Sequence, residues 1–151
     1  MKLLFPGSFD PFTIGHLDLV QRALKIADGV VIAVGINESK KCMFTAQERV
    51  DAIARFFESE PRVSVLSYSG LTMDMVRKTG ADAILRGVRS VSDFEFERNM
   101  ADVNGKVGGV ETIMLASAPQ LQHVSSSVVR ELALFGHDVS DMIIDTFDLK
   151  R

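Results

Sequence analysis

Apolar residues along the chain fall into short continuous runs, separated by stretches in which they recur at helical spacing. A short continuous run bounded by polar or glycine residues is typical of a strand that is buried on both faces of a sheet. Five segments have this pattern: residues 2–6, 30–34, 63–66, 83–85 and 112–115. The pattern therefore predicts a sheet that is covered on both faces.

The stretches between these runs have the apolar spacing of amphipathic helices. The first begins near Gly15 and continues to Ala27, and Gly29 ends it. The segment Thr45-Ala46-Gln47-Glu48 is a capping box, so a second helix should start at Thr45. We expect further helices at residues 71–79, 91 to about 104 and 128–135, with Gly80 and Gly136 as stops, and a last amphipathic stretch from residue 139 to about 149.

Strands that alternate with helices form a parallel sheet, and right-handed crossovers place helices on both of its faces. We therefore expect an α/β fold, with one domain over residues 1–151 built on a doubly wound, Rossmann-like parallel sheet of five strands. The sequence contains no internal repeat, low-complexity tract or linker that would divide this domain.

Composition narrows the classes of function. The 151 residues include 17 Lys and Arg against 20 Asp and Glu, a formal charge of −3, which argues against a chain that coats nucleic acid but leaves room for a local basic pocket. The single cysteine, Cys42, excludes an internal disulfide framework and a cysteine-rich zinc site. No apolar run approaches about 20 residues, and the first residues already have the pattern of a strand, so we expect a cytosolic protein without membrane or nucleic-acid partners.

Polar residues gather where the predicted strands end. Ligands of doubly wound sheets bind at the carboxyl ends of the strands, so the segments that follow the strands form the candidate site. These segments carry His16, Lys40, Lys41, Arg86, Arg89 and three consecutive serines at residues 125–127. Helix N-termini and arginine side chains both bind anions, and this set of groups fits a polyphosphate ligand.

Each of these residues also has a simpler interpretation. A histidine in the first turn of a helix is usually solvated, and the loop lysines could form a polar surface. Arg86 and Arg89 could form structural ion pairs with Glu95 or Glu97, and the serines could cap the helix that follows them. The turn after the first strand lacks the G-x-G-x-x-G pattern, which argues against a dinucleotide site. The polyphosphate interpretation is favoured because all of these groups arrive at one edge of the sheet.

Residues 6–16, Pro-Gly-Ser-Phe-Asp-Pro-Phe-Thr-Ile-Gly-His, resemble the first motif of the nucleotidylyltransferase superfamily, and Val-Ser-Ser-Ser at residues 124–127 resembles its second motif. Residues 39–45 and 86–97 resemble the bacterial phosphopantetheine adenylyltransferase family, and the resemblance covers nearly the whole chain in order. It implies transfer of an adenylyl group from ATP to 4′-phosphopantetheine, giving dephospho-coenzyme A and pyrophosphate, with Mg²⁺. It also implies a cytoplasmic homohexamer that coenzyme A inhibits.

The resemblance also assigns roles to individual positions. Ser8 would orient the attacking phosphate and, together with Phe9, contact ATP. His16 would contact the α-phosphate and stabilise the transition state, and Lys40 would bind both the transition state and the phosphate of phosphopantetheine. Phosphopantetheine would also contact Thr72, Arg86 and Asn104. The ATP site would further include Gly87, Val88, Arg89, Glu97, Leu121, Gln122, His123, Val124, Ser125, Ser126 and Ser127, and no residue is expected to be a metal ligand.

Several positions depart from the residues usual in the family. Phe96 stands where tyrosine is common, Leu121 and His123 replace bulkier aromatic residues, and Thr72 replaces a larger apolar residue. Two other functions stay open: a nucleotidylyltransferase that uses nicotinamide mononucleotide, glycerol phosphate or choline phosphate, and a non-catalytic nucleotide-sensing module. In the favoured reaction the attacking group is itself a phosphate, which is largely dianionic at neutral pH because its second pKa is near ~6, so no general base is required.

Overall fold

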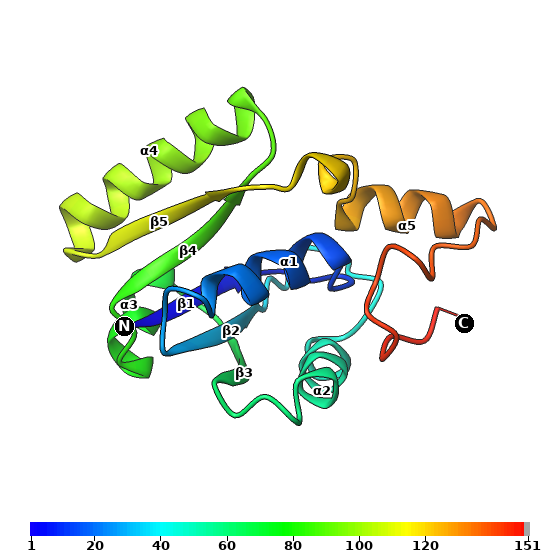
Figure 1. The fold of residues 1–151 in the computed structure, drawn as a ribbon, viewed down its shortest axis with the longest axis horizontal. Helices are drawn as coiled ribbons and strands as arrows, with labels where there is room; N and C mark the ends of the chain where they lie inside the picture. The colour runs from blue at the N-terminus through cyan, green and yellow to red at the C-terminus, as the bar shows by residue number, and fades with distance from the viewer. Residues whose placement is uncertain (150–151) are drawn as a thin grey trace.

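The computed structural model describes residues 1–149, and strands and helices alternate along the chain (Figure 1). The strands are β1 (Lys2–Gly7), β2 (Gly29–Gly35), β3 (Val63–Tyr68), β4 (Ala83–Val88) and β5 (Glu111–Ala116). The helices are α1 (Ile14–Ala23), α2 (Ala46–Phe56), α3 (Thr72–Thr79), α4 (Val91–Gly108) and α5 (Ser126–Leu134), and a short 3₁₀ helix, η1 (Pro119–Leu121), lies between β5 and α5. Every strand and helix that the sequence predicts is present.

The five strands form one sheet in the order β3-β2-β1-β4-β5, and every neighbouring pair is parallel. The chain builds outward from β1 to β3, returns to the other side of β1, and builds outward again to β5. This order confirms the predicted doubly wound fold. It also opens a crevice at the carboxyl ends of β1 and β4, where the direction of winding reverses and where such folds bind their ligands.

Successive residues of β1 serve two different cores, because side chains alternate between the faces of a sheet. Leu3 and Phe5 pack into a cluster that includes residues of α1, α2 and α5, whereas Leu4 packs with residues of α3 on the opposite face. Figure 1 shows α4 running along β4 and β5, the two strands that it joins. Helices therefore cover both faces, as the apolar runs predict.

Three helix boundaries differ from the predicted ones by two residues or more. The first helix ends at Ala23 rather than Ala27. Gly29 does not end this helix but begins β2, because the chain joins the sheet one residue earlier, where the Asp28 amide donates to the Met1 carbonyl at 2.7 Å. Helix α5 starts two residues early, at Ser126, since the Ser125 side chain caps it. Helix α4 continues past residue 104 to Gly108.

The predicted capping box at Thr45 is confirmed. The Thr45 hydroxyl accepts a hydrogen bond from the Glu48 amide at 3.2 Å, and the Glu48 carboxylate accepts one from the Thr45 amide at 2.8 Å. These reciprocal bonds satisfy amides that the first turn of α2 would otherwise leave unpaired. They also fix the point at which the polar loop after β2 gives way to α2.

The amphipathic stretch at residues 139–149 is packed without being helical. Val139, Ile143, Ile144 and Phe147 are buried, and the rings of Phe44 and Phe147 are 5.0 Å apart. The Ile14 amide donates to the Met142 carbonyl at 2.9 Å, which joins this segment to the start of α1. Figure 1 shows it turning back from α5 toward α2. Within residues 1–149, none of the helices combines the length and apolar character needed to cross a membrane.

We expect Phe147→Ala to lower the free energy of unfolding by about 3 kcal/mol, because it removes a buried ring from the core. Phe147 is 7% exposed, whereas Phe135 is 73% exposed and provides a matched control. Phe135→Ala should change stability by less than about 0.5 kcal/mol. Urea unfolding of both variants tests this, and equal effects would contradict the packing of the C-terminal segment.

Candidate active site

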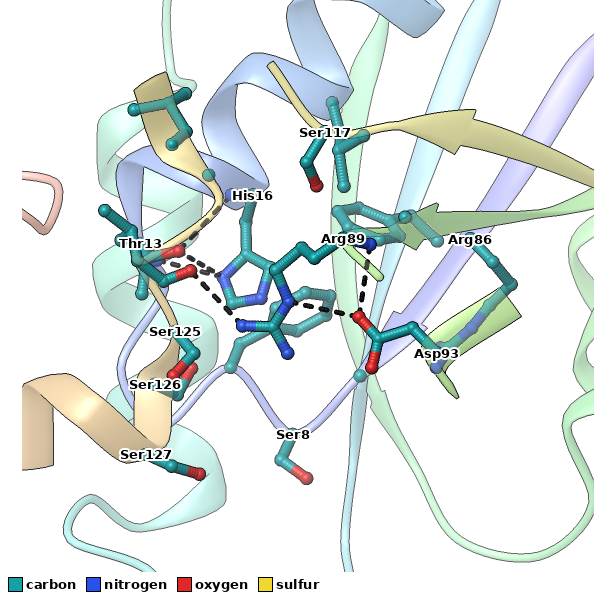
Figure 2. A pocket seen from close by; sticks show the side chains of 18 of the residues that line it. Ser8, Thr13, His16, Arg86, Arg89, Asp93, Ser117, Ser125, Ser126 and Ser127 are labelled. Carbon is teal, nitrogen blue, oxygen red and sulfur yellow. Dashed lines mark hydrogen bonds and ion pairs between the residues drawn. The ribbon is translucent and has the colours of Figure 1, made fainter. Parts of the chain in front are cut away.

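A cavity of about 310 Å³ opens at the carboxyl ends of β1 and β4 (Figure 2). Segments from four parts of the chain meet there: the loop after β1, the loop after β2, the end of β4, and the segment between β5 and α5. Figure 2 shows the three serines of α5 on one side and Arg86 and Asp93 on the other. Of the residues that the sequence predicts, the cavity is lined by Ser8, Phe9, His16, Lys40, Arg86, Gly87, Arg89, Glu97, Leu121, Val124, Ser125, Ser126 and Ser127.

Three predicted ATP-site residues are not part of this lining. Val88 is the last residue of β4 and is half-buried outside the cavity. Gln122 and His123 are exposed in the turn after the 3₁₀ helix. Their contribution to nucleotide binding stays a prediction.

A second cavity, of about 260 Å³, adjoins the first. It contains Thr72 and Asn104, the two remaining residues that the sequence predicts for phosphopantetheine, and Phe96 also lines it. Ser8, Lys40 and Arg86 line both cavities. These three side chains therefore stand at the boundary where two bound molecules would meet.

His16 is held by the start of its own helix. The Thr13 amide donates to Nδ1 of His16 at 2.9 Å, and the Thr13 hydroxyl accepts from the His16 amide at 3.3 Å. This is a capping box in which histidine takes the place usually held by Glu or Gln. Because Nδ1 accepts a hydrogen bond, the neutral ring carries its proton on Nε2.

The surroundings of His16 oppose a positive charge on the ring. Burial, assisted by the positive charges of Arg89 and Arg86, lowers the pKa of His16 from 6.5 to about 3. The ring packs edge-on against Phe9, with the centroids 5.0 Å apart. His16 is thus a neutral hydrogen-bond donor at physiological pH.

Two of the three arginines that line the cavity, Arg86 and Arg89, are paired with carboxylates. Arg86 makes a bidentate pair with Glu97, at 2.7 and 2.6 Å, and donates to the Pro6 carbonyl at 2.8 Å. The ion-pair interpretation of Arg86 is therefore correct, and Arg86 also lines both cavities. Arg89 pairs with Asp93 at 3.4 Å, so the expected partners Glu95 and Glu97 were wrong for this residue. The bidentate pair fixes the direction of the Arg86 guanidinium, whereas Arg89 has a single, longer contact with its carboxylate.

The serines mark the start of α5, and their roles differ. Ser125 is the N-cap, accepting from the Val128 amide at 3.2 Å, which confirms the capping interpretation for this residue. The Ser126 hydroxyl donates to the Pro11 carbonyl at 2.8 Å. The exposed Ser127 hydroxyl accepts from Arg130 at 3.3 Å. The N-terminus of α5, with its positive end of the helix dipole, consequently faces the cavity.

Sequence reasoning missed Arg130 in the cavity lining. Arg130 also donates to the Asp10 carbonyl at 2.7 Å. Its position three residues after Ser127, one turn along α5, was the available signal, because residues at that spacing share a helix face. Asp93 and Ser117 also line the cavity and were not predicted to do so.

Comparison with known proteins agrees with this geometry. The cytidylyltransferase-like family model matches residues 4–132, a range that contains every residue lining the first cavity. A phosphopantetheine adenylyltransferase of Porphyromonas gingivalis is 54% identical over 97% of this chain and 95% of its own length. One from Bacteroides fragilis is 49% identical over 94% of this chain and 95% of its own. The chain belongs to the phosphopantetheine adenylyltransferase family.

A solved structure supports the fold of this family member. It is a bifunctional NMN adenylyltransferase/ADP ribose pyrophosphatase from Francisella tularensis, crystallised with AMP and a manganese ion. The TM-score is 0.68 at 16% identity, and the match covers 94% of this chain and 44% of that one. At this identity the likeness concerns the fold alone.

We expect nitrogen NMR to find His16 neutral, with the proton on Nε2, at pH 7 and still at pH 5, given its pKa of about 3. Because this value lies below the 6.5 of an unperturbed histidine, unfolding takes up a proton in acid, and the free energy of unfolding should fall as the pH decreases from 6.5 toward 3.

His16→Asn provides the control, since it removes the titrating group and should lose this part of the pH dependence. An imidazolium form of His16 at pH 6 would contradict the assignment.

Proposed function

We propose that this chain transfers the adenylyl group of ATP to 4′-phosphopantetheine, giving dephospho-coenzyme A and pyrophosphate, by direct in-line attack. The observation that carries the proposal is the pair of adjoining cavities, which share Ser8, Lys40 and Arg86 along their boundary. A triphosphate in the first cavity and a phosphate monoester entering from the second would meet at these side chains. Membership of the phosphopantetheine adenylyltransferase family supports the choice of both substrates.

The reaction needs no general base, and the site geometry is consistent with this. The attacking oxygen belongs to a phosphate monoester that is already largely dianionic at neutral pH, with a second pKa near ~6. It forms a bond to the α-phosphorus of ATP while the bond to the β-phosphate oxygen breaks, and pyrophosphate leaves with that electron pair. Catalysis then rests on alignment of two anions and on stabilisation of the charge that develops between them.

His16 in the first cavity and Lys40 and Ser8 at the boundary can supply that stabilisation. The Nε2–H of His16 donates to a nonbridging oxygen of the α-phosphate, and Lys40 supplies a mobile positive charge to the attacking phosphate and the transition state. The Ser8 hydroxyl orients the attacking group. The bond from the Thr13 amide to Nδ1 supports the His16 role, because it keeps the donor nitrogen facing away from the helix.

The leaving group and the acceptor would occupy opposite sides of this boundary. The N-terminus of α5, Arg89 and Arg130 would bind the β- and γ-phosphates, since helix N-termini and guanidinium groups both bind phosphate. Thr72 and Asn104 would contact the pantetheine arm in the second cavity, and Arg86 would bind the acceptor while Glu97 holds its orientation.

We expect Mg²⁺ to enter bound to ATP. The carboxylates that line the first cavity, Asp93 and Glu97, are paired with Arg89 and Arg86. The described lining thus fits phosphate groups better than a bare cation, and Mg²⁺ commonly keeps several waters and binds through substrate phosphates. When bound, the ion neutralises phosphate charge. The cytoplasmic location, the homohexamer and inhibition by coenzyme A stay predictions.

Turnover with purified protein tests the proposal, measured in both directions. We expect pyrophosphate release from ATP with 4′-phosphopantetheine, and ATP formation from dephospho-coenzyme A and pyrophosphate. A panel that pairs ATP or CTP with nicotinamide mononucleotide, glycerol phosphate or choline phosphate tests the related transferases. Faster turnover with any of these acceptors would overturn the substrate assignment, and ATP binding without turnover on any acceptor would favour the nucleotide-sensing module.

We expect His16→Ala to lower kcat by roughly 10²–10³-fold, the usual effect of removing one donor to developing charge. The Kd for ATP, measured by calorimetry, should change by less than about threefold, because this donor acts mainly in the transition state. His137→Ala is the matched control, since His137 is exposed and lines neither of the two cavities. A kcat for His16→Ala close to that of the unmodified chain would refute the role.

A further inference from the structure

Asp10 and Arg49 are buried charged residues for which the proposed chemistry has no use. Each side chain is 3% exposed, and neither lines the two cavities of the site. Burial of a charged group is costly unless hydrogen bonds replace its water. The partners of these two side chains therefore indicate what they do.

Arg49, on α2, donates to four backbone carbonyls in three separate parts of the chain. Its Nη1 donates to the carbonyls of Ser8 at 2.5 Å and Gly35 at 3.2 Å. Its Nε donates to the carbonyls of Phe44 at 3.2 Å and Thr45 at 3.3 Å. The guanidinium thus joins the residue after β1, the end of β2 and the start of α2.

Asp10 joins two of the same segments from the other side. Its carboxylate accepts from the amides of Met43 at 2.7 Å and Phe44 at 2.8 Å. The two acceptor oxygens each take one amide, an arrangement that a neutral amide side chain cannot reproduce. Asp10 therefore ties the end of the loop after β2 to the loop after β1.

The two tethered loops carry the two groups that would act on the attacking phosphate. Lys40 lies in the loop at residues 36–43. Arg49 binds the carbonyls of Gly35 and Phe44, which flank this loop. Asp10 binds the amides of Met43 and Phe44, at the end of the loop. Lys40 is exposed, and its amide donates to the Asn37 carbonyl of the same loop at 3.0 Å, so the position of this turn depends on how the loop ends are held. Ser8 is held through its own carbonyl.

We propose that Asp10 and Arg49 are positioning residues that set Lys40 relative to Ser8 at the boundary between the two cavities. An apolar side chain at either position would leave buried backbone groups of these loops without hydrogen-bond partners. What the charges add is a fixed arrangement of two loops that have few regular backbone partners of their own. This inference rests on the proposed function, since it concerns the acceptor phosphate of that reaction.

A kinetic double-mutant cycle of Asp10→Asn with Lys40→Ala tests the inference. We expect Asp10→Asn to lower kcat/KM for 4′-phosphopantetheine by about tenfold in the otherwise unmodified chain, and by less than about twofold when Lys40 is already absent. The Kd for ATP should change by less than about threefold in all four proteins. A purely structural role would lower kcat/KM by the same factor in both backgrounds, and that result would overturn the inference.

Arg49→Lys provides a second variant, which keeps the charge but cannot span four carbonyls. It should show the same dependence on Lys40. If part of either variant were unfolded, kcat would fall with an unchanged KM, so a raised KM for phosphopantetheine separates displacement of Lys40 from loss of folded protein.

Asp82→Asn is the matched control. The Asp82 carboxylate accepts from the Lys2 amide at 2.7 Å, a bond of the same kind at the amino ends of β1 and β4, opposite the site. This variant should leave both KM values unchanged. An unmodified chain without turnover would overturn the proposed function and this inference together, whereas additive effects in an active enzyme would overturn the inference alone.

Discussion

The site depends on how the loop between β1 and α1 is held, because the sheet reverses its direction of winding beside this loop. Three side chains from two helices bind its backbone carbonyls. Arg49 of α2 donates to Ser8, while Arg130 and Ser126 of α5 donate to Asp10 and Pro11. The loop is thereby fixed between helices that are far apart in the sequence. Both cavities use it as a wall, so their shapes are set by the same hydrogen bonds.

The cavity concentrates positive side chains whose mutual repulsion must be offset. The chain as a whole has a formal charge of −3, yet Lys40, Arg86, Arg89 and Arg130 all line one cavity. Glu97 and Asp93 pair with Arg86 and Arg89, which limits repulsion between the two arginines, and the bidentate pair with Glu97 fixes the direction of Arg86. Arg130 is oriented by neutral oxygens, and Lys40 lies on an exposed loop. Donors that are oriented before a phosphate binds can stabilise charge on it without rearranging during the reaction.

The sequence predicted the features that depend on local residue patterns. It did not predict the hydrogen bonds in which a side chain binds a distant backbone carbonyl. Strand ends, the Thr45 capping box and the grouping of His16, Lys40 and the serines follow from periodicity and topology. The bonds from Arg49 to Ser8 and from Arg130 to Asp10 span 41 and 120 residues, and every residue offers a carbonyl, so no residue type signals them. Residues 139–149 show the same limit, because their amphipathic pattern is satisfied by packing on Phe44 instead of by a helix.

The capping box at α1 joins helix formation to the proposed chemistry. The amide of Thr13 would lack a partner in a bare helix start, and Nδ1 of His16 satisfies it. The same bond occupies the lone pair that a histidine base would need on that nitrogen, and it leaves a proton on Nε2. A low pKa keeps the ring neutral in the free chain. In the proposed reaction the ring would therefore add a hydrogen bond to the transition state without a proton transfer of its own. Loss of rate in mild acid would then originate in protonation of the substrate phosphate, whose second pKa is near ~6, while His16 remains unchanged.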